Sequence, residues 1–551
     1  MPAGSAPRST DCPDARDLPE DEQERPDEKR PPAKGPVVVV VGGGVSGLSA
    51  ARRLACQASV GAGRPAGAIR RPPIKVVVLE ASSRLGGKVA SGELEGRPID
   101  LGPDNFLVRD PIAERLCDSL GLGDLITAPA TGAASLLNRG RLVPLPGGLV
   151  LGVPTDLAAL ARSGVLSSRG VARASLDLLG AAPPPSDAAL GVALDQVGDG
   201  AEWSAASILG HYLGREVVAR LVDPLLGGIN AGVTTQLSLA VVAPQIARAL
   251  SGRRSAIRAL APIPPPAARS YPNNHAGSAL SPFRGLKGGL GQMISALSND
   301  LARSGVELRT DCAVASIRCV RPPSGSGRAS TLETDRQGGT GPASQHYVLE
   351  TSSGPVRADA LVLAVPAYAA ARLLVDVAPG AARELGAVPY SSVSLLTTTW
   401  ESGSLPSLPA GSGFLVGPTE RRLVTGCTVM SAKWPETAGR GRTVLRASTG
   451  RFGDLRAAEM SDEEVTRAVI QELREIVGAT GQPKSVLVQR WPRAFPQYLP
   501  GHLARVRRAR SSLDSSGPIE LAGAMLGGIG IPACISSGEA AAVAVLAHLK
   551  R

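Results

Sequence analysis

Aromatic side chains and lysines are both rare in this chain. Its 551 residues include only 5 Phe, 4 Trp and 6 Tyr, and 51 of its 59 basic residues are arginine. So few aromatics argue against the RNA-binding strands that stack bases on aromatic rings. The chain also lacks zinc-finger spacing and a basic zipper, although its formal net charge is +11. We therefore expect no nucleic acid partner. An acidic small ligand, an anionic lipid surface or a solvated arginine-rich surface would each account for the charge.

Cysteine pairs and long apolar runs are missing too. Seven cysteines are scattered over the chain, and none belongs to a C-x-x-C pair, which is typical of a reducing compartment. There is no run of about 18 apolar residues that would predict a membrane span. The first residues carry no apolar signal-peptide core. We therefore expect a cytoplasmic protein and leave open a peripheral contact with a membrane.

The composition does provide for a folded core. Hydrophobic residues make up 43% of the chain and charged residues 19%, which excludes a chain that is disordered throughout. Residues 1–35 are the exception, because they are polar, proline-rich and carry a net charge of −3. We expect them to form a disordered tail. The remainder carries +14, and the length suits about two or three domains.

The first chemical motif is a glycine-rich turn between a strand and a helix. Five valines, Val37–Val41, precede G-x-G-x-x-G at Gly42–Gly47, and a helix of small residues runs on through Ala55. The first glycine permits a tight turn, the second lets the backbone approach a pyrophosphate, and the third lets the helix pack on the strand. The helix N-terminus offers free N–H groups to phosphate. A second apolar strand, Lys75–Glu80, follows an inserted loop at 58–73, so the order predicts an α/β dinucleotide-binding domain.

The second strand ends at Glu80, where a carboxylate can accept both ribose hydroxyls of an adenosine. Glu80 lies 33 residues after Gly47 instead of about 20, and the inserted loop accounts for the excess. Residues 80–88 read E-x-x-x-R-x-G-G-K. This pattern resembles the signature of the flavin-containing amine oxidase superfamily, and nicotinamide dehydrogenases do not need it. The resemblance implies FAD, with Arg84 and Gly86-Gly87 meeting the pyrophosphate from its second side.

Further segments resemble the bacterial porphyrinogen oxidases within that superfamily. The matching segments are D-L-G-P-D-N-F-L at 100–107, D-P-L-L-G-G-I-N-A-G at 223–232, F-R-G-L-K-G-G-L at 283–290, P-Q-Y-L-P-G-H at 496–502 and G-I-G-I-P-A-C-I-S-S-G at 528–538. The last two are specific to porphyrinogen oxidases and are not general to the superfamily. Together the matches run from about residue 36 to the end of the chain.

The motifs and the resemblance imply an α/β and α+β multidomain architecture. We expect a Rossmann-like FAD-binding domain, an antiparallel-sheet substrate domain and a mostly helical insertion that is a candidate for membrane association. The expected boundaries are a tail at 1–35, an FAD-binding domain at 36–105, 283–368 and 512–551, a helical insertion at 106–250, a loop at 251–282 and a substrate-binding domain at 369–511.

The resemblance also implies the reaction. A porphyrinogen oxidase of haem biosynthesis removes six hydrogens from a cyclic tetrapyrrole in three rounds, with FAD as cofactor and molecular oxygen as final acceptor, and releases hydrogen peroxide. The amino-acid sequences of segments 100–107 and 223–232 are similar to those of porphyrinogen oxidases from high-GC Gram-positive bacteria. That similarity implies coproporphyrinogen III as substrate, with protoporphyrinogen IX as the alternative. The protein is expected to be a monomer or a homodimer.

Carried over position by position, the resemblance implies a set of FAD contacts. They are Gly42, Gly43, Gly44, Val45, Ser46, Gly47, Leu48, Glu80, Ala81, Arg84, Lys88, Gly102, Pro103, Asp104, Asn105, Val314, Trp491, Gly523, Ile529, Gly530 and Ile531. No catalytic side chain is expected, because the sequence contains no Ser-His-Asp set, paired acid–base candidates or metal cluster. A structural role is favoured for His502 over a catalytic one.

Three residues are candidates for substrate contact. Arg109 suits the propionate carboxylates, because a guanidinium pairs with a carboxylate through two hydrogen bonds. Phe106 and Tyr498 are candidates for contact with the macrocycle. Two other readings stay open: a polyamine or carotenoid oxidase, and a non-catalytic flavoprotein or membrane-docking partner. The second is motivated by Ala533, which stands where porphyrinogen oxidases usually have Asp.

Overall fold

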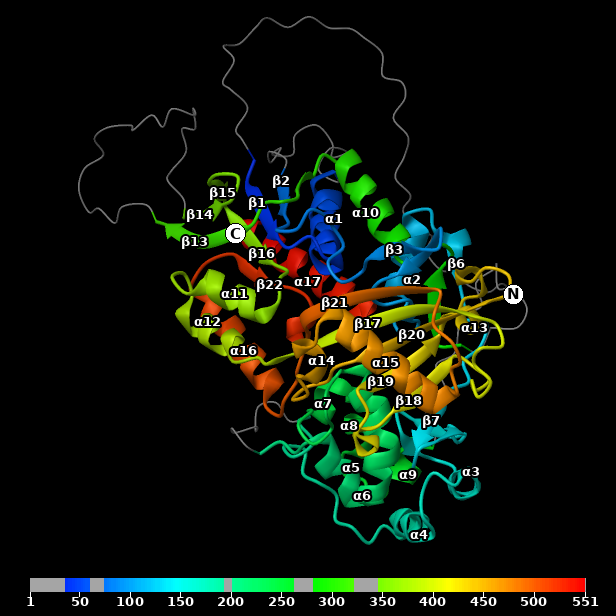
Figure 1. The fold of residues 1–551 in the computed structure, drawn as a ribbon. Coiled ribbons are helices and arrows are strands. Elements are labelled where there is room, and N and C mark those ends of the chain that lie inside the picture. Colours follow the sequence, from blue (N-terminus) through cyan, green and yellow to red (C-terminus); the bar gives the residue numbers. More distant parts are fainter. Residues whose placement is uncertain (1–34, 60–73, 193–200, 262–280, 322–344, 551) are drawn as a thin grey trace, which may run out of the picture.

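A computed structural model describes residues 35–59, 74–192, 201–261, 281–321 and 345–550 (Figure 1). The expected disordered tail lies outside the described residues, apart from Gly35. So do most of the loops expected at 58–73 and 251–282.

A five-stranded parallel sheet forms the centre of the first body. Its order is β12 (Glu307–Arg309), β2 (Lys75–Leu79), β1 (Val37–Val41), β16 (Ala360–Leu363) and β22 (Ile519–Leu521). β1 pairs in parallel with β2 on one side and with β16 on the other. A central strand covered on both faces favours an unbroken run of β-branched residues, and Val38, Val39 and Val40 are fully buried. The predicted Rossmann-like arrangement is confirmed.

Different elements cover the two faces of this sheet (Figure 1). One face packs against the helices α1 (Val45–Ser59), α2 (Ile112–Ser119), α10 (Gly291–Arg303) and α17 (Ile531–Lys550). The other packs against the strands β13 (Val314–Val320), β14 (His346–Thr351) and β15 (Val356–Ala358), and against the helices α11 (Ala367–Leu374), α12 (Pro379–Gly386) and α16 (His502–Asp514).

α17 is the one helix in the described part of the chain that is long and apolar enough to cross a membrane. Half of its apolar stretch is buried inside the protein, and it crosses α1 closely at Gly538. A Cβ there would lie 2.1 Å from the carbonyl oxygen of Ser46. These contacts are those of a core helix.

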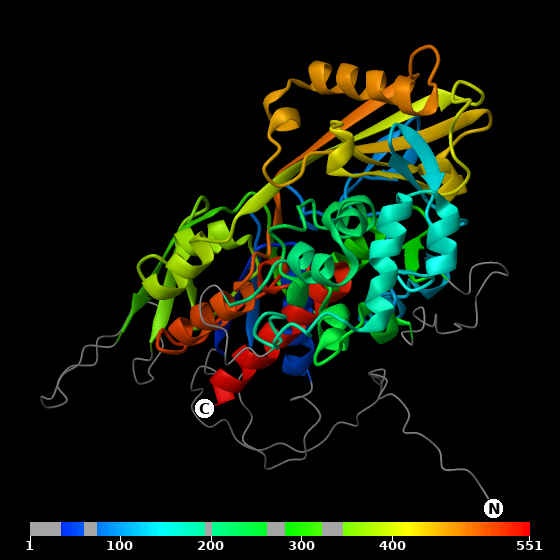
Figure 2. The same cartoon turned by 90° about the horizontal axis from the view of Figure 1, so that it is seen from below.

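A seven-stranded sheet forms the centre of the second body. Its order is β21 (Ser485–Pro496), β17 (Tyr390–Glu401), β20 (Arg442–Thr449), β19 (Val424–Val429), β18 (Gly413–Val416), β7 (Ser135–Asn138) and β8 (Arg141–Pro144). Helix α15 (Asp462–Val477) lies along one face (Figure 2). Ser461 and Glu464 form a capping box at its start. All but one of the neighbouring strand pairs are antiparallel, as expected for the substrate domain.

The segment expected to be mostly helical, 106–250, differs from the prediction in its first part. It opens with short strands: β5 (Phe106–Leu107), β6 (Ile126–Thr127), β7, β8, β9 (Leu149–Val150) and β10 (Val153–Pro154). β5 and β6 flank β11 (Phe283–Leu286), and β7 and β8 join the seven-stranded sheet. Strands of two to four residues are too short to show an alternating pattern, so the sequence did not reveal them.

α2 is the exception in this first part, and after residue 156 the segment is helical, with its helices packed around one apolar core. They are α3 (Leu157–Ser163), α4 (Ser168–Ser175), α5 (Ala205–Leu213), α6 (Arg215–Val217), a π-helical segment η4 (Val218–Gly227), α7 (Leu239–Val242), α8 (Pro244–Leu250) and α9 (Ala256–Leu260). α9 lies within 251–282, which we expected to be a loop. Ser255 caps its N-terminus by accepting a hydrogen bond from the Arg258 N–H.

Candidate FAD and active site

The glycine turn has the geometry that its sequence predicts. Gly42 adopts φ +106°, in the left-handed region that favours glycine, and a Cβ there would lie 2.6 Å from the carbonyl oxygen of Ala364. A Cβ at Gly47 would lie 1.9 Å from the carbonyl oxygen of Gly42. At Gly44, by contrast, no described protein atom lies within 4 Å of the Cβ position. Two glycines are therefore required by close packing, whereas Gly44 borders open space at the start of α1.

Glu80 is attached to this turn. Its Oε2 accepts a hydrogen bond from the Gly43 N–H at 2.7 Å, and its Oε1 accepts from the N–H and hydroxyl of Ser82. Its carbonyl oxygen accepts from the Cys312 N–H at 2.8 Å, which brings the start of β13, at Val314, beside the end of β2. The carboxylate expected at the ribose and Val314, another expected FAD contact, thus lie close together.

The R-x-G-G segment forms the other wall of the turn. The Gly86 N–H donates to the carbonyl oxygen of Gly43 at 2.8 Å, and a Cβ at Gly87 would lie 3.2 Å from the Cα of Gly44. Arg84 donates from Nη2 to the carbonyl oxygen of Gly87 at 2.8 Å. Two glycine segments that are distant in sequence therefore make one continuous backbone surface.

Lys88, Gly102 and Trp491 meet at one end of this surface. A Cβ at Gly102 would lie 2.1 Å from the carbonyl oxygen of Lys88 and 3.7 Å from the Trp491 ring. Trp491 donates from Nε1 to the carbonyl oxygen of Leu101 at 2.8 Å, and Arg84 lies 5.9 Å from its ring centroid. The indole is therefore held in one orientation at the junction of the two bodies.

The Lys88 side chain is accessible to solvent, yet desolvation by the surrounding protein lowers the pKa of its ammonium group. Cys534 acts in the opposite direction on the Lys88 pKa, which places the start of α17 nearby.

Near the carboxyl terminus, Gly523 and the start of α17 return to the same turn. The Gly523 N–H donates to Ser537 Oγ at 2.9 Å, and a Cβ at Gly523 would lie 3.5 Å from Ser46 Oγ. Residues Ile529 and Gly530 directly precede α17, and Ile531 begins it. The N-termini of α1 and α17 therefore face the same region, and both favour negative charge.

Two of the proposed substrate residues are buried. Phe106 is 2% exposed and packs in the core of the first body. Tyr498 is 1% exposed, donates its hydroxyl proton to the carbonyl oxygen of Ala524 and packs against the His502 ring. Burial raises its pKa well above the usual value. Arg109 is exposed. Only Arg109 among the three presents its side chain freely to solvent.

His502 is also buried. Its Nε2 lies 3.1 Å from the carbonyl oxygen of Met525, and burial lowers its pKa to about 4. A neutral, buried imidazole that hydrogen-bonds to a backbone carbonyl supports the structural role that we expected.

The sequence did not reveal the network around Asp104. Its carboxylate accepts from Lys433 Nζ at 2.8 Å, from Trp434 Nε1 at 2.8 Å and from Arg446 Nη2 at 2.9 Å. Burial would raise its pKa, but Arg446 and Lys433 together with these hydrogen bonds hold the pKa well below its usual range. Arg446 also donates to the carbonyl oxygens of Asp100 and Gly102. Two cations in the second body thereby hold the segment that ends at Asn105.

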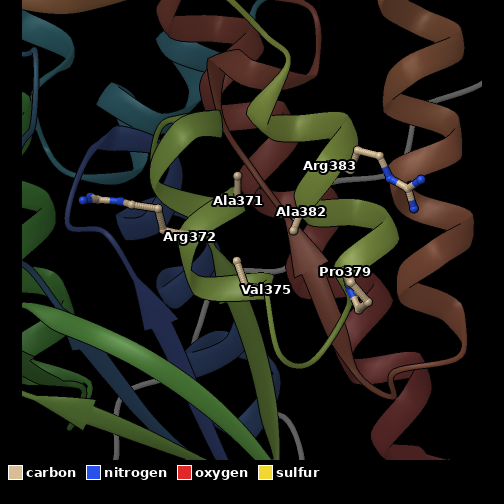
Figure 3. A pocket seen from close by; sticks show the side chains of 6 residues that line it. All are labelled: Ala371, Arg372, Val375, Pro379, Ala382 and Arg383. Atoms are coloured by element: carbon tan, nitrogen blue, oxygen red, sulfur yellow. The ribbon is translucent and has the colours of Figure 1, made fainter.

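A surface hollow between α11 and α12 shares no residue with this site (Figure 3). Its lining residues are Ala371, Arg372, Val375, Pro379, Ala382 and Arg383. Figure 3 shows the two arginine side chains extending away from one another, so polar groups do not converge there.

The residues present fit a bound FAD. The space beside Gly44 is open, the start of α1 presents its N–H groups there, and the Glu80 carboxylate lies beside them, hydrogen-bonded to the Gly43 N–H. These are the requirements of a pyrophosphate and a ribose at the carboxyl edge of a parallel sheet.

Comparison with known proteins agrees with this geometry. The family model of flavin containing amine oxidoreductases matches residues 45–546. The chain is 30% identical over 513 residues to a coproporphyrinogen III oxidase of Bacillus subtilis, covering 93% of this chain and 98% of that protein. It is 32% identical over 541 residues to a coproporphyrinogen III oxidase of Propionibacterium freudenreichii, covering 92% and 90%.

A solved structure agrees as well. It is a candidate protoporphyrinogen oxidase from Exiguobacterium sp. 255-15, which superimposes with a TM-score of 0.72 at 28% identity and covers 94% of this chain and 100% of that one. The family model alone covers most of the sequence. This chain therefore belongs to the family of flavin-containing amine oxidoreductases.

Proposed function

We propose that this protein is an FAD-dependent oxidase that converts coproporphyrinogen III to coproporphyrin III in haem biosynthesis, with oxygen as final acceptor and hydrogen peroxide as by-product. The observation that carries the proposal is the similarity to coproporphyrinogen III oxidases at 30% and 32% identity over nearly the whole of each chain. The continuous glycine surface beside Glu80 and Lys88 supports it, because it provides the cofactor with a binding edge.

Each part of FAD is bound by a different set of groups in this chain. Backbone N–H groups at the start of α1 bind the pyrophosphate, and Glu80 binds the ribose. Arg84 and Lys88 supply positive charge along the same edge, and Trp491 lies at the flavin end with its indole fixed by Leu101. When bound, FAD accepts a hydride from a bridging carbon of the substrate.

The remaining expected FAD contacts are proposed from their positions in the chain. The described structure places Gly523, Ile529, Gly530 and Ile531 around the start of α17, and Val314 at the start of β13. The Asp104 carboxylate already accepts hydrogen bonds from Arg446, Lys433 and Trp434. We therefore propose that the 102–105 segment contacts the cofactor through its backbone.

We also propose two functional domains. The FAD-binding domain comprises 36–105, 283–368 and 512–551, which together supply every strand of the parallel sheet. The substrate domain comprises 369–511, and β7 and β8 extend its sheet with residues from the segment 106–250.

The closest competing substrate is protoporphyrinogen IX. The test is anaerobic reduction of the bound flavin by each porphyrinogen in parallel, followed by porphyrin fluorescence and peroxide production in air. We expect faster flavin bleaching by coproporphyrinogen III. Faster bleaching by protoporphyrinogen IX would contradict the proposed substrate. Bleaching by amines alone would indicate an amine oxidase, and a flavin spectrum with no turnover would indicate a non-catalytic flavoprotein.

For location and assembly we propose a cytoplasmic monomer or homodimer with peripheral membrane contact. Leu176 and Leu179, which are 52% and 74% exposed in the helical segment, support such contact. Sedimentation with and without anionic lipid vesicles tests it. If the protein stays in the supernatant when anionic vesicles are sedimented at low ionic strength, membrane contact is contradicted.

A further inference from the structure

Arg493 has an unusual backbone conformation beside the proposed flavin end. Its φ is +46°, in the left-handed region that residues other than glycine rarely adopt. β21 bulges here, because Trp491 pairs with Val393 and Phe495 with Ser391, which leaves three residues of β21 opposite Ser392. The Arg493 N–H donates to Ser392 Oγ at 2.9 Å. Such bulges redirect side chains and are frequent next to active sites.

The bulge presents the Arg493 side chain to an aromatic face. Its guanidinium carbon lies 3.5 Å from the ring centroid of Tyr368. Tyr368 in turn packs edge-to-face on Tyr390, with ring centroids 5.1 Å apart, and the Tyr390 hydroxyl oxygen accepts from the Ala367 N–H at 2.8 Å. The arginine is thus held by a supported aromatic stack.

Stacking leaves the hydrogen-bonding edge of the guanidinium unused. Arg493 is exposed, and the described residues give it no carboxylate partner within ion-pair distance. A guanidinium held by its flat face can still donate two parallel hydrogen bonds to a carboxylate. Holding it in advance also reduces the entropy lost on binding.

The position of the stack matches that of the proposed site. Arg493 follows Trp491 by two residues. Tyr368 follows β16 at its carboxyl end, where Ala364 packs against Gly42 of the glycine turn. The stack therefore joins α11 of the first body to β21 of the second body, near the sheet edge that carries the proposed cofactor surface. Ligands of parallel sheets bind outside this edge.

We infer that Arg493, held by Tyr368, binds a propionate carboxylate of the tetrapyrrole and contributes to substrate recognition. The inference rests on the proposed function, because a porphyrinogen with propionate groups is the ligand that offers the carboxylate. Arg493 would act in binding, since a residue that binds a remote carboxylate equally in ground and transition state changes KM and leaves kcat.

The test compares Arg493→Gln with wild type in two assays. One titrates the holoenzyme with coproporphyrin III and follows porphyrin fluorescence. The other measures KM and kcat for coproporphyrinogen III. We expect Kd and KM to rise roughly tenfold, as for loss of a charge-assisted hydrogen bond, with kcat within about twofold. Arg493→Lys should recover only part of the affinity, because lysine keeps the positive charge but cannot donate two parallel hydrogen bonds to one carboxylate. The tetramethyl ester of the porphyrin should bind wild type and R493Q equally.

The matched control is Arg421→Gln. Arg421 is also an exposed arginine with a left-handed backbone, φ +55°, but it lies in a turn of the second body away from β21. R421Q should leave Kd and KM unchanged. Unchanged Kd and KM in R493Q would overturn the inference. A fall in kcat and flavin content at constant Kd would also overturn it, since that result indicates a structural role.

The two hypotheses fail separately. A wild-type protein that binds coproporphyrin III in an Arg493-dependent way but oxidises no porphyrinogen would refute the proposed function and retain the inference. Oxidation of coproporphyrinogen III with the same KM in wild type and R493Q would refute the inference and retain the proposed function.

Discussion

Asp104 and Arg446 form a buried ion pair of 2.9 Å that joins the two bodies of the protein. Both side chains are less than 9% exposed. Arg446 lies in β20, whereas Asp104 lies in the segment that ends beside the proposed flavin site. The pair therefore couples the position of residues 102–105 to the seven-stranded sheet.

Replacing Arg446 by Met should destabilise the folded holoenzyme by about 3 kcal/mol, because Asp104 would lose one of two cations inside the protein. Thermal or urea unfolding followed by flavin fluorescence measures the loss. Arg442→Gln is the control on the same strand, since Arg442 is one-third exposed and its ion pairs with Glu95 and Glu401 are long. Equal stability of R446M and R442Q would contradict the role given to the buried pair.

Asp100→Asn should change the pH dependence of stability. Burial raises the pKa of Asp100 to about 6, above its ordinary 3.8, and outweighs the hydrogen bonds from Ser91 and Leu290. The unfolded state therefore releases its proton first, so this carboxyl makes the fold less stable as pH rises from about 4 to 6. The Asn variant removes that loss and should be more stable than wild type at pH 7, by roughly 1 kcal/mol or more.

Asp104→Asn gives the opposite sign. The pKa of Asp104 is lowered in the folded state, so its ionised form stabilises the fold at neutral pH and the contribution disappears only in strong acid. D104N should lose stability at pH 7. Denaturation curves at pH 4.5 and pH 7 distinguish the two variants, and a D100N protein as pH-sensitive as wild type would contradict the assignment.

Gly44→Ala and Gly47→Ala should separate cofactor binding from folding. A Cβ at Gly44 meets no described protein atom within 4 Å, whereas a Cβ at Gly47 would lie 1.9 Å from the Gly42 carbonyl oxygen. G44A should fold with a Tm close to that of the wild-type apoprotein and bind FAD at least about tenfold more weakly, because the methyl occupies the space of the pyrophosphate. G47A should fold poorly. Wild-type FAD affinity in G44A, measured by flavin fluorescence titration, would show that the turn does not hold the cofactor.

Lys88→Met tests the positive charge at the end of the glycine surface. If the Lys88 ammonium faces the cofactor, its removal should shift the flavin midpoint potential to more negative values, since nearby positive charge favours the reduced flavin. A shift on the order of 30 mV corresponds to about 1.4 kcal/mol for a two-electron couple. Dye-coupled reductive titration measures the potential. Lys433→Met serves as the control for a cation that is paired with Asp104, and equal shifts in both would contradict a local effect of Lys88.

Parts of the fold were predictable because their causes are local in sequence. Val37–Val41, the glycine turn and Glu80 specify a strand, a turn and a strand end through backbone sterics and periodicity alone. The capping box of Ser461 and Glu464 likewise depends on neighbours along the chain. The short strands of 106–154 were not predictable, because β7 is a strand only through its pairing with the distant β18, and β8 only through its pairing with β7.

The candidate site likewise has a part that the sequence predicted and a part that depends on the tertiary structure. By itself, the sequence determined the glycine turn and the carboxylate at the end of β2, since each motif carries its own geometry, and its resemblance to a known family indicated the R-x-G-G segment. Only the tertiary structure decided that Tyr498 is buried, that Arg446 is bonded to Asp104 and that Arg493 rests on Tyr368. Tyr498 and its partner Ala524 lie 26 residues apart in the sequence, and Asp104 and Arg446 lie 342 residues apart. Side chains so far apart in sequence meet only where long-range packing outweighs the entropy lost in ordering the chain between them.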